Sequence, residues 1–301
     1  MSLSPAYQAA LDRLREAGIA SADPTSASLE QARAVQQRYF GFLAQDPPAL
    51  ADVREHAFAG PAGTVRLRSY HPEASSGLPV IVFVRGAGWW AGDLDSHDRT
   101  ARLCALGSGL PVLSVDYHCA PESNFPVQRD EVTATVQWLN SQGSAIDVDG
   151  QSVILWGESA GASLSVLATS RLLQQGNGSV KGLILLYGNF EGPTERTRAY
   201  SKWVWTQYLG TPWEQVAPDA VPLRCRVDGF PTAWLGVGDE DPLLRDTLLM
   251  EAALREHGVG TTLRRYPGLP HGFATMSKVF PEAVDIIDEA AAHARRMAGV
   301  A

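Results

Sequence analysis

A strand-like apolar run that passes through a turn of small residues into a helix-like stretch constrains this chain more than any other feature. The apolar run covers Val153–Trp156, the turn reads GESAG at residues 157–161, and the helix-like stretch extends from Ala162 to Gln174. The turn matches G-x-S-x-G, the pattern of a sharp strand-to-helix turn that leaves a serine hydroxyl exposed. The flanking glycines fit because a Cβ there would collide with the neighbouring strand and helix. The pattern predicts an α/β sheet with Ser159 as a candidate nucleophile.

Two further signals lie downstream, in the order serine, acid, histidine that such a site requires. His271 lies on a Pro- and Gly-rich loop directly after the strand-like segment Thr261–Tyr266. Between the serine and this histidine, another apolar run, Thr232–Val237, leads into three acids: Asp239, Glu240 and Asp241. A carboxylate at the end of a strand can orient an imidazole and stabilise its protonated form. All three acids qualify by position, and we expect two of them to form a solvated turn that caps the following helix.

A loop of small residues after another predicted strand offers candidate donors for an oxyanion. The apolar run Leu78–Val84 ends in RGAGWW at residues 85–90. Acyl transfer needs backbone N–H groups that point at the developing oxyanion, and the residue after the nucleophile, Ala160, supplies another donor. The alternative interpretation is a dinucleotide-binding loop, since Gly86-x-Gly88-x-x-Ala91 fits a loose fingerprint. The two tryptophans make a poor helix start, which disfavours that alternative.

With these motifs, nearly the whole chain resembles the hormone-sensitive-lipase-like branch of the α/β-hydrolases, the bacterial carboxylesterases. Further marks of the resemblance are GDLDSH at 92–97, SVDYHCAPE at 114–122, FP at 125–126, DPL at 241–243 and HGF at 271–273. The resemblance implies that Ser159 is the nucleophile, Asp241 the acid and His271 the base. It also implies an oxyanion hole formed by the N–H groups of Ala87, Gly88 and Ala160.

The chain departs from the family pattern at several positions. Arg85 and Ala87 stand where the family has histidine and glycine, Glu158 replaces an aspartate, His118 replaces an arginine, and the segment 189–230 is short for the family. We expect the Ala87 methyl to lie beside the acyl-binding space and to favour a negative φ. We also expect Arg85 to pair with Glu158 or Asp93, and so to hold the oxyanion loop in place of the missing histidine.

The remaining pattern predicts alternating strands and helices. The predicted strands are 64–70, 79–84, 111–115, 152–155, 181–186, 232–237 and 261–266, and the predicted helices are 5–17, 29–44, 97–106, 128–141, 160–174, 245–257 and 281–297. Continuous apolar strands separated by helices indicate a mostly parallel sheet covered on both faces. We expect residues 51–188 and 231–301 to form an α/β-hydrolase core. Residues 1–50 and the insertion 189–230 then form a helical cap, whose aromatic residues line a pocket or attach the cap to the sheet.

Composition narrows the partners and the compartment. The formal net charge of −8 argues against nucleic acid and anionic membranes as partners. The three cysteines show no metal-binding spacing and fit free thiols in a reducing cytoplasm. Neither a signal peptide nor a membrane-spanning run is visible in the sequence. We therefore expect a cytoplasmic monomer or homodimer without metal or cofactor.

The function that the sequence favours is hydrolysis of small esters with short acyl chains through an acyl-enzyme intermediate. Three alternatives stay open at this stage, and a thiol-dependent activity of Cys119 is the least favoured because no base for it is evident in the sequence. Of the other two, one is an amidase or N-deacetylase that uses the same three residues. The other is a ligand-binding hydrolase homologue with weakened catalysis, for which Arg85 and Ala87 are the supporting departures.

Overall fold

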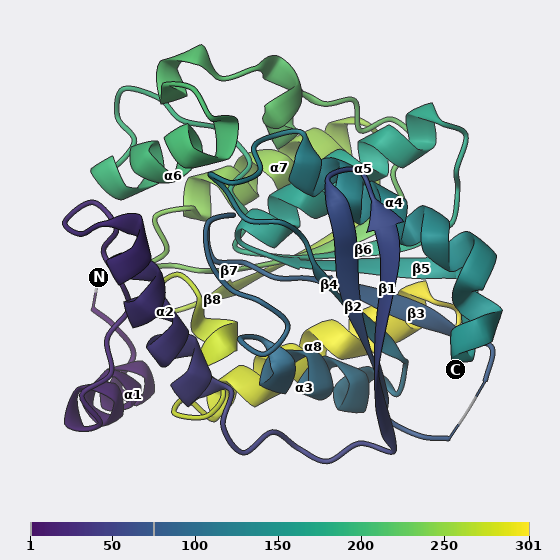
Figure 1. Ribbon diagram of the computed structural model, residues 1–301, viewed down its shortest axis with the longest axis horizontal. Helices are drawn as coiled ribbons and strands as arrows, with labels where there is room; N and C mark the ends of the chain where they lie inside the picture. The colour runs from purple at the N-terminus through teal and green to yellow at the C-terminus, as the bar shows by residue number, and fades with distance from the viewer. Residues whose placement is uncertain (1, 75, 301) are drawn as a thin grey trace.

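The computed structural model describes residues 2–74 and 76–300, and within them eight strands form a single sheet in the order β1-β2-β4-β3-β5-β6-β7-β8 (Figure 1). The strands are β1 Asp52–Gly60, β2 Gly63–His71, β3 Leu78–Val84, β4 Val112–Asp116, β5 Val148–Glu158, β6 Val180–Leu186, β7 Thr232–Gly238 and β8 Thr261–Tyr266. From β4 to β8 neighbouring strands run parallel, whereas β2 runs antiparallel to both β1 and β4. The parallel strands therefore bring their carboxyl ends to one edge of the sheet, where ligands bind in folds of this kind.

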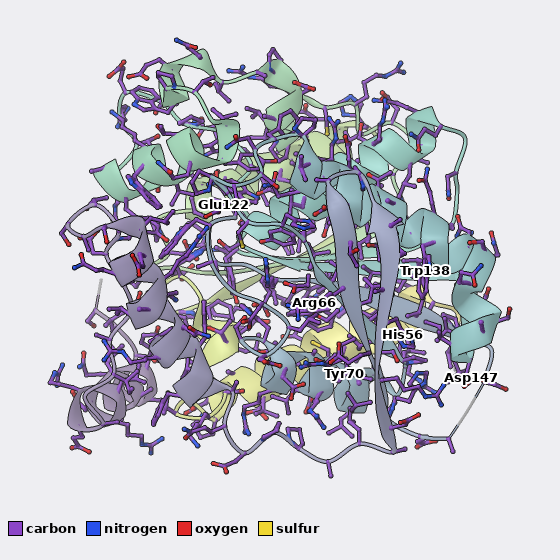
Figure 2. The ribbon with its side chains drawn as sticks, in the orientation of Figure 1. His56, Arg66, Tyr70, Glu122, Trp138 and Asp147 are labelled. Atoms are coloured by element: carbon purple, nitrogen blue, oxygen red, sulfur yellow. The ribbon has the colours of Figure 1, made fainter. Side chains whose placement is uncertain are left out.

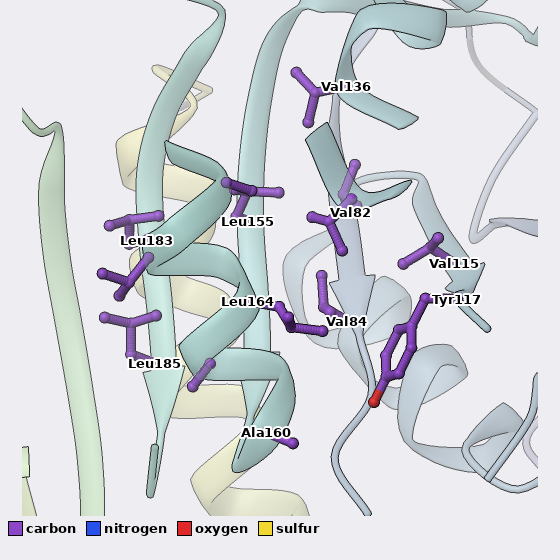
Figure 3. Packing of buried hydrophobic residues seen from close by; sticks show 14 of the residues in the cluster. Val82, Val84, Val115, Tyr117, Val136, Leu155, Ala160, Leu164, Leu183 and Leu185 are labelled. Carbon is purple, nitrogen blue, oxygen red and sulfur yellow. The ribbon is translucent and has the colours of Figure 1, made fainter. Parts of the chain in front are cut away.

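Helices cover both faces of this sheet. α4 Val127–Gln142, α5 Ala160–Gln174 and α7 Leu244–Glu256 pack on one face, and α3 Asp98–Ser108 and α8 Glu282–Met297 pack on the other (Figure 1). Side chains that alternate along each strand feed the two cores, as the pleat requires. In β5, for example, Leu155 belongs to the core beneath α4 and α5 while Ile154 belongs to the core beneath α3 and α8. Figure 3 shows Leu155, Leu183 and, beside Val84, Leu164 of α5 among the side chains of the first of these cores.

Three further helices lie outside this layered core. α1 Pro5–Glu16 and α2 Leu29–Leu43 lie at one side of the molecule, and α6 Ala199–Leu209 lies near them beyond the carboxyl edge of the sheet (Figure 1). Ser4 and Ser28 cap α1 and α2, each accepting a hydrogen bond from a first-turn N–H group. α1 contributes Tyr7 to the core beneath α8. The division of the chain into a cap and a core at residues 50, 189 and 230 stays a prediction.

The predicted strands and helices are all present, with ends that differ by a few residues. β1 was not predicted, and α6 lies in the insertion that was expected to be helical but for which no helix range was predicted. β1 contains Arg54, Glu55 and His56, so its sequence lacks a clear apolar alternation. It forms as an edge strand paired with β2, and it packs over α4 through Phe58 and His56, whose rings lie 6.0 and 6.2 Å from that of Trp138. Figure 2 shows His56 beside Trp138 at this edge. Among the described residues, we find no helix of the length and apolar character that crossing a bilayer requires.

Candidate active site

Ser159 lies in the turn between β5 and α5 with a backbone conformation that few residues adopt. Its φ is 51° and its ψ is −117°, and its N–H donates to the Leu186 carbonyl at 2.9 Å. A Cβ at Gly157 would lie 2.4 Å from the Gly161 carbonyl oxygen, and one at Gly161 would lie 1.9 Å from the Val84 carbonyl oxygen. Both glycines are therefore required by close packing, as the sequence predicts. The strained turn aims the Ser159 side chain away from the sheet.

Loops at the ends of three strands bring Ser159, His271 and Asp241 together. The Oγ of Ser159 lies 2.8 Å from Nε2 of His271. Nδ1 of the same imidazole lies 2.9 Å and 3.1 Å from the two carboxylate oxygens of Asp241. A carboxylate can only accept, so Nδ1–H donates to Asp241 and Nε2 is left to accept from the Ser159 hydroxyl. This geometry permits the imidazole to take a proton from the hydroxyl.

The electrostatic setting of His271 favours its protonated form. Burial by itself lowers the pKa of the imidazole, but the charge of Asp241 and the hydrogen bond to it raise the pKa above its ordinary value. The Asp241 side chain is fully buried and also accepts from the Leu243 N–H at 2.7 Å, which fixes its orientation. The other two acids behave differently from Asp241. Asp239 forms an ion pair with Arg265 at 2.7 Å, and neither Asp239 nor Glu240 is recorded as a partner of His271 in the described chain.

The loop after β3 lies next to Ser159, since a Cβ at Gly86 would lie 3.3 Å from the Cβ of Ser159. Ala87 and Gly88 have φ values of 73° and 60°, and both line the same cavity as Ser159. Ala160 is the first residue of α5, so its N–H has no acceptor within the helix. Within the described residues, no backbone acceptor is recorded for the N–H groups of Ala87 and Gly88. Contrary to the expectation of a negative φ, Ala87 adopts the left-handed conformation that favours glycine. The loop does not start a helix, since α3 begins at Asp98.

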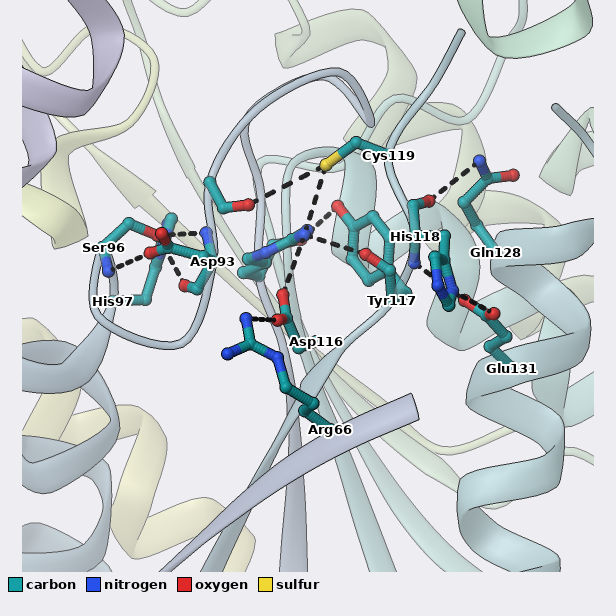
Figure 4. A network of polar contacts seen from close by, with 12 residues as sticks. Arg66, Asp93, Ser96, His97, Asp116, Tyr117, His118, Cys119, Gln128 and Glu131 are labelled. Carbon is teal, nitrogen blue, oxygen red and sulfur yellow. Dashed lines mark hydrogen bonds and ion pairs between the residues drawn. The ribbon is translucent and has the colours of Figure 1, made fainter. Parts of the chain in front are cut away.

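The expected pairing of Arg85 with Glu158 or Asp93 is wrong. The buried guanidinium turns toward β4, where its Nη2 lies 3.4 Å from Asp116 and donates to the Tyr117 carbonyl at 2.9 Å. Figure 4 shows Asp116, Tyr117 and Cys119 in this polar network. β3 lies between β4 and β5, and Glu158 ends the strand on the other side. The carboxylate of Asp93 is used within its own turn, where it accepts from the Ser96 N–H at 2.8 Å.

Residues 117–119 complete the surroundings of Arg85. Its guanidinium carbon lies 3.8 Å from the centre of the Tyr117 ring, and its Nη2 lies 3.4 Å from the Cys119 sulfur. The Tyr117 hydroxyl donates to the carbonyls of Arg85 and Gly86, both at 3.1 Å. Arg85 thus contacts Asp116, Tyr117 and Cys119 in place of the predicted partners. His118 points the other way and contacts Glu131 with its Nδ1 at 2.6 Å.

Glu158 is a buried carboxyl group directly before Ser159. It is 1% exposed, its carboxylate forms no ion pair within the described chain, and its hydrogen-bonding neighbour is the Tyr187 hydroxyl. Burial raises its pKa to about 8, against the smaller opposing influence of the Tyr187 hydroxyl and the His271 imidazole. The group is therefore predominantly uncharged at neutral pH. The Tyr187 ring also packs edge-on against the imidazole of His271, with ring centres 5.0 Å apart.

A cavity of about 400 Å³ opens over Ser159. Its walls come from the oxyanion loop, from α2 with Tyr39 and Phe40, and from the start of α6 with Tyr200 and Val204. The volume suits a small organic molecule. Four aromatic residues of the insertion, Trp203, Trp205, Tyr208 and Trp213, do not line this cavity.

These aromatic residues instead attach α6 to the rest of the molecule. Tyr208 stacks on Trp89 with ring centres 4.0 Å apart, and Trp205 meets Trp89 edge-on at 5.1 Å. The structure thus shows attachment for Trp205 and Tyr208, and Trp205 also lines a second cavity next to the one over Ser159. Tyr187 and Tyr117 are site residues that the sequence alone does not single out by chemistry, although Tyr117 lies within one of the family motifs.

The comparisons with known proteins agree with this geometry. Residues 81–275 match the family model described as the alpha/beta hydrolase fold. The chain is 31% identical to the carboxylic ester hydrolase LipN of Mycobacterium tuberculosis over 86% of this chain and 73% of that protein. An esterase of the archaeon Pyrobaculum calidifontis superposes with a TM-score of 0.89 at 26% identity, covering 99% of each chain. The carboxylesterase EstE1 from a metagenomic library superposes with a TM-score of 0.84 at 27% identity, covering 91% of this chain and 98% of EstE1. The chain therefore belongs to the α/β-hydrolase family, in its hormone-sensitive-lipase-like branch.

Proposed function

We propose that this protein is a serine carboxylesterase that hydrolyses esters with short acyl chains through an acyl-enzyme intermediate. The observation that carries the proposal is the contact of His271 Nε2 with the Ser159 hydroxyl at 2.8 Å, while Nδ1 of the same ring contacts Asp241 at 2.9 Å. The relatives support it, since those named above are carboxylic ester hydrolases and esterases.

In the first half-reaction, Ser159 attacks the ester carbonyl as its proton moves to His271. Asp241 stabilises the imidazolium that forms. The N–H groups of Ala87, Gly88 and Ala160 donate to the oxyanion of the tetrahedral intermediate. His271 then gives the proton to the departing alcohol, which leaves Ser159 acylated.

In the second half-reaction, His271 takes a proton from water as the water attacks the acyl carbonyl. The same N–H groups hold the second oxyanion, and the acid is released as the proton returns to Ser159. The neutral state of Glu158 matters here, because a charged carboxylate beneath Ser159 would oppose the negative charge of both intermediates.

The cavity volume of about 400 Å³ supports short acyl chains as substrates. A series of p-nitrophenyl esters tests this, with kcat/KM expected to be highest between roughly acetyl and hexanoyl and to fall for longer chains. A preference for emulsified long-chain lipid would contradict the proposal, and so would faster hydrolysis of p-nitroacetanilide than of p-nitrophenyl acetate.

The role of Ser159 has its own test. Ser159→Ala should abolish ester hydrolysis while the circular dichroism spectrum and the unfolding midpoint stay close to those of the wild type. A fluorophosphonate should label the wild-type protein at Ser159, and mass spectrometry of the labelled peptide identifies the site. Labelling at another residue, or full activity of Ser159→Ala, would show that the nucleophile is a different group.

A further inference from the structure

The cavity over Ser159 carries a positive charge that the proposed mechanism does not use. Apart from tyrosines, the ionisable residues that line it in the described chain are His97, Glu158, Arg198 and His271. Burial lowers the pKa of His97 to about 3, so this imidazole carries no charge at neutral pH. Glu158 is predominantly uncharged at neutral pH because burial raises its pKa to about 8. His271 is engaged with Asp241, whose carboxylate balances any charge on the imidazole. Arg198 is therefore the cavity's unbalanced charge.

Arg198 lies where a bound molecule can reach it. It directly precedes α6, its side chain is exposed, and it lines both the cavity over Ser159 and an adjoining cavity of about 680 Å³. Ser201, one turn further along, lines both cavities too. In residues 2–74 and 76–300, no carboxylate forms an ion pair with Arg198 and no acceptor is recorded for its side chain.

The carboxylates around Arg198 are already bound to other groups. Glu191 pairs with Arg245 at 3.0 Å, and Glu195 lies 3.9 Å from the ammonium of Lys202. Asp246 accepts from the backbone N–H groups of residues 190 and 191 at 2.8 and 2.9 Å. The guanidinium is thus left without a protein counter-charge, and its planar set of donors fits a carboxylate.

We propose that Arg198 selects ester substrates that carry a carboxylate, either at the far end of the acyl chain or on the alcohol. This proposal rests on the esterase function above and names its substrate class. A protein with a formal net charge of −8 repels anions at long range, so an unpaired cation in the cavity wall offers such substrates a favourable local contact. A neutral ester of the same size gains nothing from it.

The test compares matched charged and neutral esters. For the acyl side the pair is monoethyl glutarate and ethyl 4-carbamoylbutanoate, and for the alcohol side it is 4-carboxyphenyl acetate and 4-carbamoylphenyl acetate. Initial rates in a pH-stat at neutral pH give kcat/KM for each. For each pair we take the ratio of kcat/KM for the charged ester to kcat/KM for the neutral ester. Comparison of this ratio between protein variants cancels the difference in intrinsic reactivity of the two esters.

In at least one pair, Arg198→Gln should lower this ratio, because the charged ester loses its contact with the guanidinium. The expected fall is only about fivefold, because solvent screens the exposed guanidinium. The wild-type ratio should fall as salt increases, and Arg198→Lys should keep part of it. Arg196→Gln is the matched control, because Arg196 lines the adjoining cavity but not the cavity over Ser159. That variant should leave the ratio unchanged.

Two results would overturn the proposal while leaving the esterase function intact. One is an unchanged ratio in Arg198→Gln for both ester pairs. The other is an equal fall in Arg196→Gln, which would indicate a general field and not a contact with Arg198. No hydrolysis of any of the four esters or of p-nitrophenyl acetate would instead contradict the esterase function itself, and this proposal with it.

Discussion

The guanidinium of Arg85 lies over the ring of Tyr117 at 3.8 Å, and the Tyr117 hydroxyl donates back to the Arg85 carbonyl at 3.1 Å. Arg85 and Tyr117 therefore contact each other twice, once between the guanidinium and the ring and once between the hydroxyl and the backbone carbonyl. The same hydroxyl also donates to the Gly86 carbonyl, one residue before Ala87. The loop that carries the proposed oxyanion donors is thus fixed from below by a buried cation and a buried aromatic ring.

Arg85→Met should weaken both stability and catalysis. The variant loses the buried hydrogen bond to the Tyr117 carbonyl and the contact with the ring, which together are worth about 2 kcal/mol of unfolding free energy. A loop that shifts by a fraction of an ångström misplaces its N–H groups, so kcat should fall more than KM rises. Urea unfolding and steady-state kinetics measure the two effects.

Arg66→Met is the matched control for this variant. Arg66 pairs with the same carboxylate, Asp116, but its side chain is 64% exposed. Its removal should change the unfolding free energy by no more than about 0.5 kcal/mol and leave kcat intact. A folded Arg85→Met protein with wild-type kcat would show that Arg85 does not position the oxyanion loop.

The three clustered acids differ sharply in their expected contributions. Asp241→Asn should lower kcat by about three to four orders of magnitude, because the imidazole loses the group that fixes its tautomer and stabilises its charge. Asp239→Asn removes an ion pair with Arg265 and should change kcat only slightly. Kinetics of both variants with one p-nitrophenyl ester compare the two acids, and similar losses would shift the assignment away from Asp241.

The pH profile should report the perturbed imidazole. Attack by Ser159 needs neutral His271, so kcat/KM should rise with pH through the pKa of His271. Burial lowers that pKa, whereas the charge of Asp241 and the hydrogen bond to it raise the pKa. The net direction is above the ordinary value of 6.5. Activity should accordingly be lost on the acid side at a pH above 6.5, and the residual activity of Asp241→Asn should show a lower midpoint. A midpoint below 6.5 in the wild type would contradict the coupling between these two groups.

Much of this arrangement follows from the sequence, for identifiable reasons. Strands such as β3 and β6 are continuous apolar runs, and α5 follows from its turn. β1 was missed because an edge strand half in solvent does not need strict apolar alternation. α6 was missed because its aromatic residues, which pack against Trp89, follow no single helical face.

The candidate site, like the fold, could be predicted from the sequence only in part. The spacing of turn, strands and loops predicts that Ser159, His271 and an acid converge, but choosing Asp241 among three neighbours required the resemblance to a family. The partner of Arg85 was predicted wrongly because both β4 and β5 offer a carboxylate next to it in the sheet. Only the rotamer of the buried side chain decides between them, and no periodicity in a sequence encodes a rotamer.

Glu158 should make the stability of the protein depend on pH. Its pKa is about 8 in the folded state, mainly through burial, against an ordinary value of 4.5. Between these two pH values the unfolded chain has released a proton that the folded protein keeps, so stability falls as pH rises from about 4.5 to about 8. Glu158→Gln removes this dependence.

The comparison is between the free energies of urea unfolding of Glu158→Gln and the wild type across pH 5 to 9. The variant should match the wild type near pH 5 and exceed it by on the order of 2 kcal/mol at pH 9, because a buried amide carries no charge to desolvate. A difference between Glu158→Gln and the wild type that stays constant with pH would show that Glu158 is ionised in the folded protein throughout this range.

Ala87→Gly should widen the range of accepted esters. Ala87 lines the cavity beside Ser159 at a φ of 73°, a conformation that costs a residue with a Cβ about 1–2 kcal/mol and costs glycine little. The greater freedom of glycine in the unfolded chain offsets about 0.4–1 kcal/mol of that gain, so the unfolding free energy should rise slightly or stay level.

The proposed oxyanion donors are backbone N–H groups, so the change from Ala87 to Gly removes none of them. Loss of the methyl group frees space for a branched alcohol, and kcat/KM for tert-butyl acetate relative to ethyl acetate should increase by about tenfold. Ala91→Gly, at a residue that lines a different cavity, should leave this ratio as it is in the wild type. If Ala87→Gly also leaves it unchanged, the Ala87 methyl does not limit the size of the substrate.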